Sequence, residues 1–269
     1  MLSRTLKMAF WVCYDHLGKL IVVNLFSMLV LAAPGMVTWT AVASGDAAVV
    51  AWIGLPALFL MTGVLGPALA AGLAHMAKEL IETRDGSVRT FFRGLRQFGL
   101  RAVGVGLCYS LAASCLAVST WFYATRLGTA MPWLGYLLSA VALWCLIGLG
   151  LSALLAMPAL VQKRAGGGGT LKLSGLLMLD NPWFCIGLTL HVGMLGVFAV
   201  VPPILMLFSI APAVVLVTSG YEMLSRKYAA AATQEALATG PLRPAVVFND
   251  AEDDYLNRGF RDFLFPWKG

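Results

Sequence analysis

The chain alternates between long uncharged apolar stretches and short segments that hold almost all of its charge. The uncharged stretches run over residues 20–45, 47–77, 102–125, 127–162 and 181–221. A helix needs about 20 apolar residues to cross roughly 30 Å of hydrocarbon, so each stretch is long enough to span a bilayer. The pattern predicts an all-α fold, a polytopic membrane helix bundle.

The last stretch predicts two crossings rather than one. As a single helix it would be about 60 Å long at about 1.5 Å per residue. Pro202-Pro203 lies at its middle, and a proline pair stops or sharply kinks a helix. We therefore expect crossings over 183–201 and 204–221. The second stretch is also long, and Pro56 with Gly66-Pro67 predicts a kink or tilt there.

The distribution of basic residues tests this count of crossings. With six transmembrane helices and the N-terminus inside, all of the 19 Lys and Arg residues except Arg126 lie on the inner side. Five crossings would place the basic residues of the C-terminal tail on the outer side, which the positive-inside rule disfavours. The charges therefore predict six crossings with both termini in the cytoplasm.

Composition supports lipid, rather than water, as the solvent of this chain. It is 59% hydrophobic and 12% charged, with a mean hydropathy of +0.82, whereas a soluble domain is about a quarter charged. The net charge of +6 sits in short clusters between apolar stretches. This arrangement is typical of a membrane protein. We therefore expect the lipid bilayer as a partner, and we do not expect nucleic-acid binding.

Two inner segments have the pattern of short amphipathic cytoplasmic helices. Residues 87–101 place apolar side chains on one helical face and basic side chains on the other, and the expected membrane-surface residues are Arg89, Phe91, Phe92, Arg93 and Arg96. Each arginine near anionic lipid contributes about 1 kcal/mol to surface binding. Residues 171–179, after the glycines at 166–169, predict a shorter helix that leads into Asn181-Pro182.

The tail, residues 229–269, differs from the six-helix transmembrane domain, residues 1–228. An Ala-rich segment extends the last helix until Gly240-Pro241 ends it. After an acidic stretch, aromatic residues recur at helical spacing. This segment is either a helix that folds back on the inner membrane face or a docking peptide for a partner, through Tyr255, Phe260, Phe263 and Trp267.

Polar side chains deep in the apolar stretches are few. Asn24 predicts an interhelical hydrogen bond, and the alternative is a ligand contact that it shares with His191. Ion-coupled transporters carry several intramembrane ionisable groups, so the scarcity of such groups argues against that class. Ser152 and His191 lie at a similar depth and define a remote alternative, an intramembrane serine hydrolase.

The sequence contains no other pattern with an established chemistry. Its five cysteines form no CxxC pair, and no Walker or Rossmann motif is present. The expected metal and cofactor content is none, and we do not expect an enzyme.

Scattered residues resemble the YesL family of bacterial multi-pass membrane proteins over about Met8 to Lys227. The matching positions are Gly18, Asn24-Leu25, Pro34, Thr38, Thr90-Phe91-Phe92, Phe98, Lys172, Asn181-Pro182 and Pro202. The acidic–aromatic tail and the glycines at 166–169 are not part of the resemblance.

The resemblance implies a bacterial plasma (inner) membrane and six helices, with no established activity and no catalytic residues. Relatives of this type accompany genes for carbohydrate uptake. The resemblance therefore implies an accessory component of a larger membrane assembly, such as a carbohydrate uptake system with a membrane-protein partner. The alternative is a stand-alone permease for a neutral small solute.

Overall fold

The computed structural model describes residues 1–163, 166–200, 209–239 and 254–258, which form helices and no strands. Among these residues, four helices are long and apolar enough to cross a membrane, which is the pattern of a multi-pass membrane protein. They are α2 (Leu17–Ala43), the composite helix Ala47–Glu82, the composite helix Val88–Leu127, and α8 (Pro132–Lys163).

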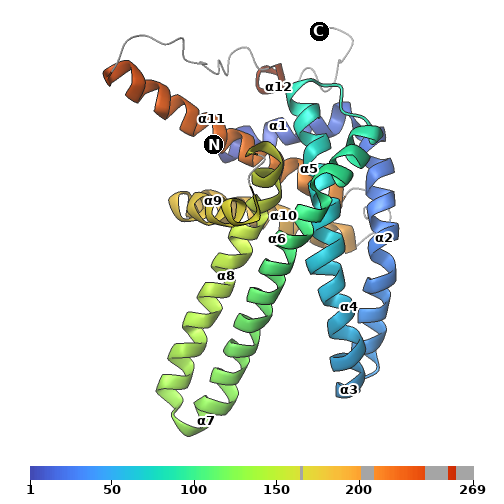
Figure 1. Ribbon diagram of the computed structural model, residues 1–269, viewed down its shortest axis with the longest axis vertical. Helices are drawn as coiled ribbons and strands as arrows, with labels where there is room; N and C mark the ends of the chain where they lie inside the picture. Colours follow the sequence, from blue (N-terminus) through green and yellow to red (C-terminus); the bar gives the residue numbers. More distant parts are fainter. Residues whose placement is uncertain (164–165, 201–208, 240–253, 259–269) are drawn as a thin grey trace.

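The four long helices form two hairpins that project in the same direction and diverge toward their tips (Figure 1). In the first, Gly45 adopts a φ of 69° after α2, and Asp46 caps α3 (Ala47–Val49) by accepting a hydrogen bond from the Ala48 N–H at 2.8 Å. In the second, α6 (Val88–Phe122) passes through η3 (Tyr123–Leu127) and α7 (Gly128–Ala130) into α8. Each outer turn is therefore short.

The second crossing contains the irregularity that its prolines predict. Two π-helical stretches, η1 (Val50–Gly54) and η2 (Leu60–Leu65), alternate with α4 (Leu55–Phe59) and α5 (Gly66–Glu82). Pro56 and Pro67 each follow a π-helical stretch. Proline has no N–H to donate and its ring clashes with a carbonyl of the preceding turn, so a wider turn accommodates it without breaking the helix.

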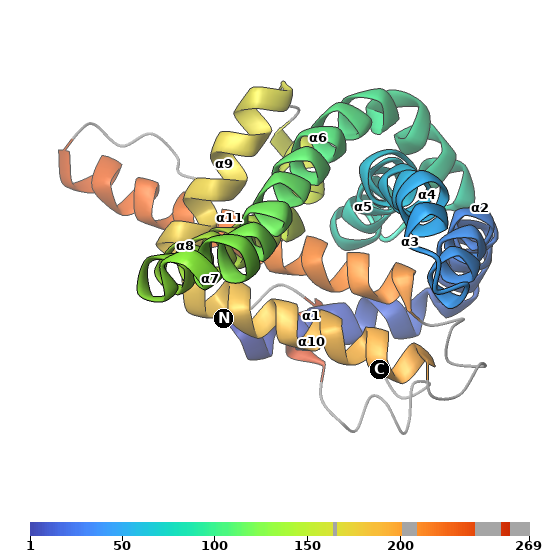
Figure 2. The same cartoon turned by 90° about the horizontal axis from the view of Figure 1, so that it is seen from below.

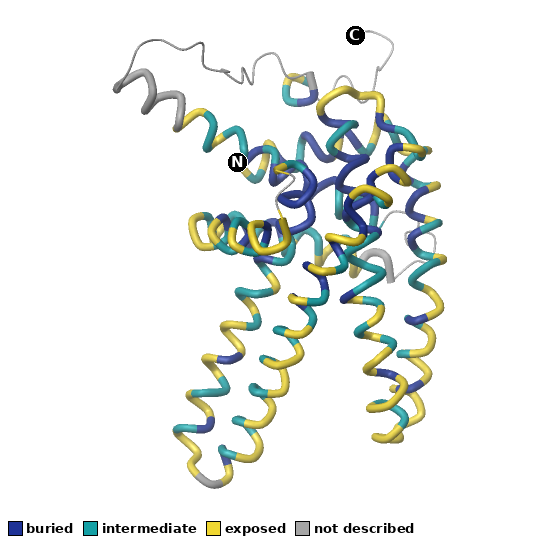
Figure 3. The backbone as a smooth tube through the Cα atoms, viewed as in Figure 1, coloured by how far each residue is buried: buried dark blue, intermediate teal, exposed yellow. Residues whose placement is uncertain are grey.

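A second layer of helices lies across the inner ends of the hairpins. It contains α1 (Leu2–Asp15), α9 (Gly167–Asp180), α10 (Pro182–Val200), α11 (Ile210–Thr239) and the short α12 (Asp254–Asn257). Seen from below, α1, α9, α10 and α11 extend sideways while α2, α4 and α5 are viewed end-on (Figure 2). Buried residues concentrate where this transverse layer meets the hairpins, and the outer halves of the hairpins are largely exposed (Figure 3).

Among the described residues, four helices are long and apolar enough to cross a membrane, or five if α9 and α10, which bend by 103° at Asn181, count as one broken span, whereas the predicted number was six. The predicted sixth crossing falls on α11, which is apolar only at its beginning and then carries Glu222, Arg226 and Lys227. Because α11 packs against α1 and α5, protein rather than lipid covers its apolar start. The predicted turn at Pro202-Pro203 lies outside the described residues.

The amphipathic segment at 87–101 is not a separate surface helix. It is the first part of α6, which begins at a capping box formed by Ser87 and Thr90. Phe91 and Phe98 are buried in the protein core. Phe91 was predicted to lie at the membrane surface, but its burial leaves it without lipid contact. Helix α9 matches the second predicted segment, although it begins within the glycines at Gly167.

Exposed tryptophans mark the far end of both hairpins. Trp39 and Trp52 flank the first outer turn, and Trp121 and Trp133 flank the second. Tryptophan is enriched where hydrocarbon meets the headgroups, because its ring is apolar and its N–H is polar. The tips therefore suit a membrane–water interface, and Asp46 and Arg126 are the charged residues beside them.

Close backbone approach joins the two hairpins near their inner ends. A Cβ atom at Gly106 would lie 2.3 Å from the Pro67 Cγ and 2.6 Å from the Gly63 carbonyl oxygen. Only glycine fits this crossing of α6 over the second span, as is common where membrane helices pack through small residues.

We expect Gly106→Ala to lower the free energy of unfolding by about 1–3 kcal/mol, because a methyl group here overpacks the crossing. The matched control is Gly104→Ala on the same helix, where a Cβ meets nothing within 4 Å. Thermal unfolding in detergent compares the two variants. Equal melting temperatures for both would contradict the close approach.

Candidate functional site

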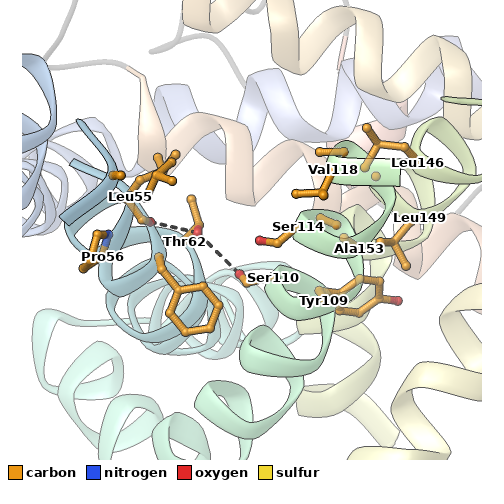
Figure 4. Close-up of a pocket in the computed structure, with 16 residues that line it drawn as sticks. Leu55, Pro56, Thr62, Tyr109, Ser110, Ser114, Val118, Leu146, Leu149 and Ala153 are labelled. Atoms are coloured by element: carbon orange, nitrogen blue, oxygen red, sulfur yellow. Dashed lines mark hydrogen bonds between the residues drawn. The ribbon is translucent and has the colours of Figure 1, made fainter. Parts of the chain in front are cut away.

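A cavity of about 920 Å³ separates the two hairpins within their membrane-spanning part (Figure 4). The second crossing, α6 and α8 provide its three walls, and the cavity is open on its remaining side. The lining residues are Ala51, Leu55, Pro56, Leu58, Phe59, Thr62, Tyr109, Ser110, Ala113, Ser114, Ala117, Val118, Leu146, Leu149, Gly150 and Ala153.

Small side chains dominate the α6 wall of this cavity. Ser110, Ala113, Ser114 and Ala117 recur at the three- and four-residue spacing that places them on one helical face. Gly150 and Ala153 continue the small surface on α8. Surfaces of this kind let another helix approach closely in lipid.

The hydroxyl groups of Thr62, Ser110 and Ser114 form a polar strip, the hydroxyl seam, along the otherwise apolar lining. The Ser110 Oγ donates a hydrogen bond to the Thr62 Oγ1 at 3.4 Å, and Thr62 donates to the Leu58 carbonyl at 2.9 Å. Figure 4 shows Ser114 directed toward the space between the walls. The lining therefore offers hydroxyls to an occupant and no charged side chain.

A buried hydroxyl network lies beside the cavity and includes one of its lining residues, Tyr109. The Tyr109 hydroxyl lies 2.8 Å from the Ser174 Oγ and 3.1 Å from the Ser152 Oγ, which joins α6, α8 and α9. Ser152 also donates to the Leu149 carbonyl at 2.9 Å. Buried hydroxyls need partners in a medium without water, and this network supplies them.

The structure gives Ser152 and His191 separate partners. The His191 Nδ1 lies 2.7 Å from the Gly187 carbonyl oxygen of its own helix, α10, while Ser152 bonds Tyr109. No hydrogen bond joins Ser152 to His191 within the described ranges. A nucleophile and its base need that contact, so the geometry does not assemble the predicted hydrolase pair. The residues that the structure describes also contain no group of three or more His, Cys, Asp or Glu side chains that could hold a metal ion.

Asn24 forms an interhelical hydrogen bond, which is the first of its two predicted roles. Its side chain is buried in α2, and its Oδ1 accepts hydrogen bonds from the backbone N–H groups of Ile210 at 3.0 Å and Ala211 at 2.9 Å. These N–H groups begin α11 and have no partner within the helix. Asn24 therefore ties the first hairpin to the transverse layer, and its carbonyl oxygen is not directed to a ligand.

The described part of the tail folds back onto the protein. The Tyr255 side chain is 2% exposed, and its hydroxyl donates to the Leu80 carbonyl at 3.4 Å. The Arg84 guanidinium lies 4.9 Å from the centre of the Tyr255 ring, and the Lys7 Nζ donates to the Leu256 carbonyl at 2.5 Å. Tyr255 is therefore covered by its own chain.

Arg258 completes this attachment of the tail. Its Nη1 lies 2.6 Å from the Asp15 Oδ2, and its guanidinium lies 5.2 Å from the centre of the Trp11 ring. The other predicted docking residues, Phe260, Phe263 and Trp267, lie outside the described residues.

His16 lies at the junction of α1 and α2, next to Asp15. Its Nε2 is buried without a hydrogen-bond partner among the described residues. Burial lowers the pKa of His16 below its ordinary value of 6.5, and the positive charges of Lys19, Arg258 and Arg84 lower it further against the opposing effect of Asp15. The folded protein therefore favours neutral His16.

No protein-family model, curated protein or solved structure matches this chain. The resemblance to the YesL family therefore stays a prediction that rests on the residues quoted above.

We expect Asn24→Ala to lower the free energy of unfolding by about 2 kcal/mol, because it removes a helix cap and leaves buried N–H groups unpaired. The matched control is Ser27→Ala, a buried residue of the same helix whose hydroxyl donates to the Val23 carbonyl at 2.8 Å. Thermal unfolding of both variants in detergent provides the measurement. A pure ligand role for Asn24 predicts no loss of stability in the absence of ligand.

We expect acidification below pH 6.5 to destabilise the fold partly through His16. Because its pKa is lowered in the folded state, the unfolded chain binds more protons in this range, so stability is lost as the pH falls. Melting temperatures at pH 7.5 and pH 5 should differ less in His16→Gln than in the parent chain. An identical pH dependence in both proteins would contradict the assignment.

Proposed function

We propose that this chain is a non-catalytic component of a larger membrane assembly, which binds a membrane-spanning helix of a partner in the cavity between its two hairpins. The single observation that supports this is the cavity itself, about 920 Å³ in volume and walled by three helices. In the most apolar 18-residue segment of each of the four spans, only 11–22% of the residues are buried. The hairpins therefore leave wide apolar surfaces for contacts within the membrane.

The chemistry of the lining favours a helix as the occupant. Ser110, Ala113, Ser114 and Ala117 present a smooth face on α6, against which a backbone packs closely. Their hydroxyls can exchange hydrogen bonds with a partner helix, a contact favoured in lipid because water is absent. A carbohydrate uptake system, to which the YesL resemblance points, is the kind of assembly we propose.

The proposed location is a bacterial plasma membrane, with both termini in the cytoplasm. Four crossings keep every Lys and Arg residue except Arg126 on one side, as six crossings do. The positive-inside rule assigns that side to the cytoplasm. The transverse layer then lies at the cytoplasmic membrane face.

A second candidate function is a stand-alone permease for a neutral small solute. The observation that favours it is the hydroxyl seam of Thr62, Ser110 and Ser114 along a cavity without charged groups. Such a lining suits a solute that exchanges hydrogen bonds and carries no charge. Uptake of labelled sugars by proteoliposomes that contain the purified chain alone separates this candidate from the first.

We expect a photo-crosslinking residue at Ala113, inside the cavity, to form a discrete protein adduct in native membranes. The matched control position is Leu111 on the same helix, which is exposed and does not line the cavity, and which should crosslink mainly to lipid. Adding Ala117→Trp should abolish the Ala113 adduct, because the indole fills the cavity. Lipid adducts alone at both positions, with sugar uptake by the purified chain, would favour the permease instead.

A further inference from the structure

A basic pocket lies on the inner part of α6, apart from the cavity between the hairpins. Arg89, Phe92, Arg93, Arg96 and Gln97 line a hollow of about 470 Å³. The three arginines recur at four- and three-residue spacing, which places them on one face of the helix. All five residues are exposed, and the lining contains no carboxylate.

The three arginines form no ion pair with the residues that the structure describes. Ion pairs there use Lys78, Arg226 and Arg258 instead. An arginine cluster without carboxylate partners retains its full set of donors for an external anion. The partial positive charge at the start of α6 adds to this field.

The pocket is held on a rigid support. Behind it, Phe91 and Phe98 are buried in the core, and the Ser87–Thr90 capping box fixes where α6 begins. At its side, the Phe92 ring packs edge-on against Phe26 of α2, with 5.2 Å between ring centroids. The arginine side chains therefore extend from a backbone whose position is set by packing.

The helix face that carries the pocket continues into the membrane as an apolar surface. Leu100, one turn after Arg96 and Gln97, is 88% exposed, and Leu111 on the same face is also exposed. No charged residue follows on α6 after Arg101. The order along this face, cations first and exposed apolar side chains next, matches the order of headgroup and acyl chains in a phospholipid.

We propose that this pocket binds the headgroup phosphate of an anionic phospholipid, with the acyl chains lying along Leu100. Guanidinium groups bind phosphate through paired, charge-assisted hydrogen bonds. The Gln97 amide can donate to, or accept from, a headgroup hydroxyl beside the phosphate. Basic pockets at the cytoplasmic ends of membrane helices are suited to such headgroups. The proposal does not depend on the function proposed above.

The test measures the phosphatidylglycerol retained by the purified full-length chain, by native mass spectrometry from mixed micelles with phosphatidylcholine as the reference lipid. We expect retention to weaken about fivefold for Arg93→Gln and roughly a hundredfold when Arg89, Arg93 and Arg96 are all changed to Gln. The matched control changes Lys19, Lys163 and Lys172 to Gln, which removes the same charge on the same side of the membrane. That control should retain the lipid.

Two further arms separate a lipid from a free anion. Leu100→Asn should weaken retention of phosphatidylglycerol, whereas inorganic phosphate should not displace the lipid at millimolar concentration. Thermal unfolding checks that each variant is folded, which we expect because the changed side chains are exposed, apart from the half-buried Lys19. Equal loss in the arginine and lysine variants would reduce the effect to general surface charge and overturn the proposal. Displacement by inorganic phosphate, or unchanged retention in the arginine variant, would also overturn it.

Discussion

The start of α11 is buried, and a helix that begins inside a protein must find acceptors for its first N–H groups. Asn24 provides the acceptor from the first third of the membrane-spanning helix α2. The free energy of leaving those groups unpaired in an apolar setting is large compared with most single contacts. This one interaction positions α11 across the hairpins, and α1, α5 and α10 then pack on α11. The transverse layer and its core depend on it.

The sequence predicted an all-helical fold with apolar helices long enough to cross a membrane, and the described residues contain four or five of them where the sequence indicated six. The difference has a physical reason. Charge asymmetry reports the side on which a segment lies, so it distinguishes even from odd numbers of crossings. It does not distinguish four from six, because the basic residues before α10 and those in the later part of α11 lie on the same side whether or not these two helices cross. Hydropathy fails there too, since the interior of a protein accepts the same apolar side chains as lipid does. The start of α11 is apolar because α1 and α5 cover it.

The candidate site was only partly predictable. Asn24 stood out because an amide is rare at that depth, and an interhelical hydrogen bond was one of its two expected roles. Its acceptance from backbone groups 186 and 187 residues away could not be predicted, because sequence spacing carries no signal for such a contact. Small residues on α6 permit close packing, as the approach of Pro67 and Gly63 to Gly106 shows. The cavity beside them arises from the divergence of the hairpins, which depends on tertiary packing. Ser152 and His191 matched in depth, but they bond Tyr109 and Gly187 instead.

The two short outer turns also bear on how the protein enters a membrane. Each carries one charged residue, Asp46 or Arg126, so each hairpin can insert as a unit at the cost of translocating a single charge. The transverse layer forms later, because it joins α1 to α11 and α12, which are synthesised after both hairpins. Its core closes only when α11 and α12 are present. During biogenesis, the apolar sides of α1 and of the inner hairpin ends are therefore open to chaperones and to misassembly until the last helices arrive.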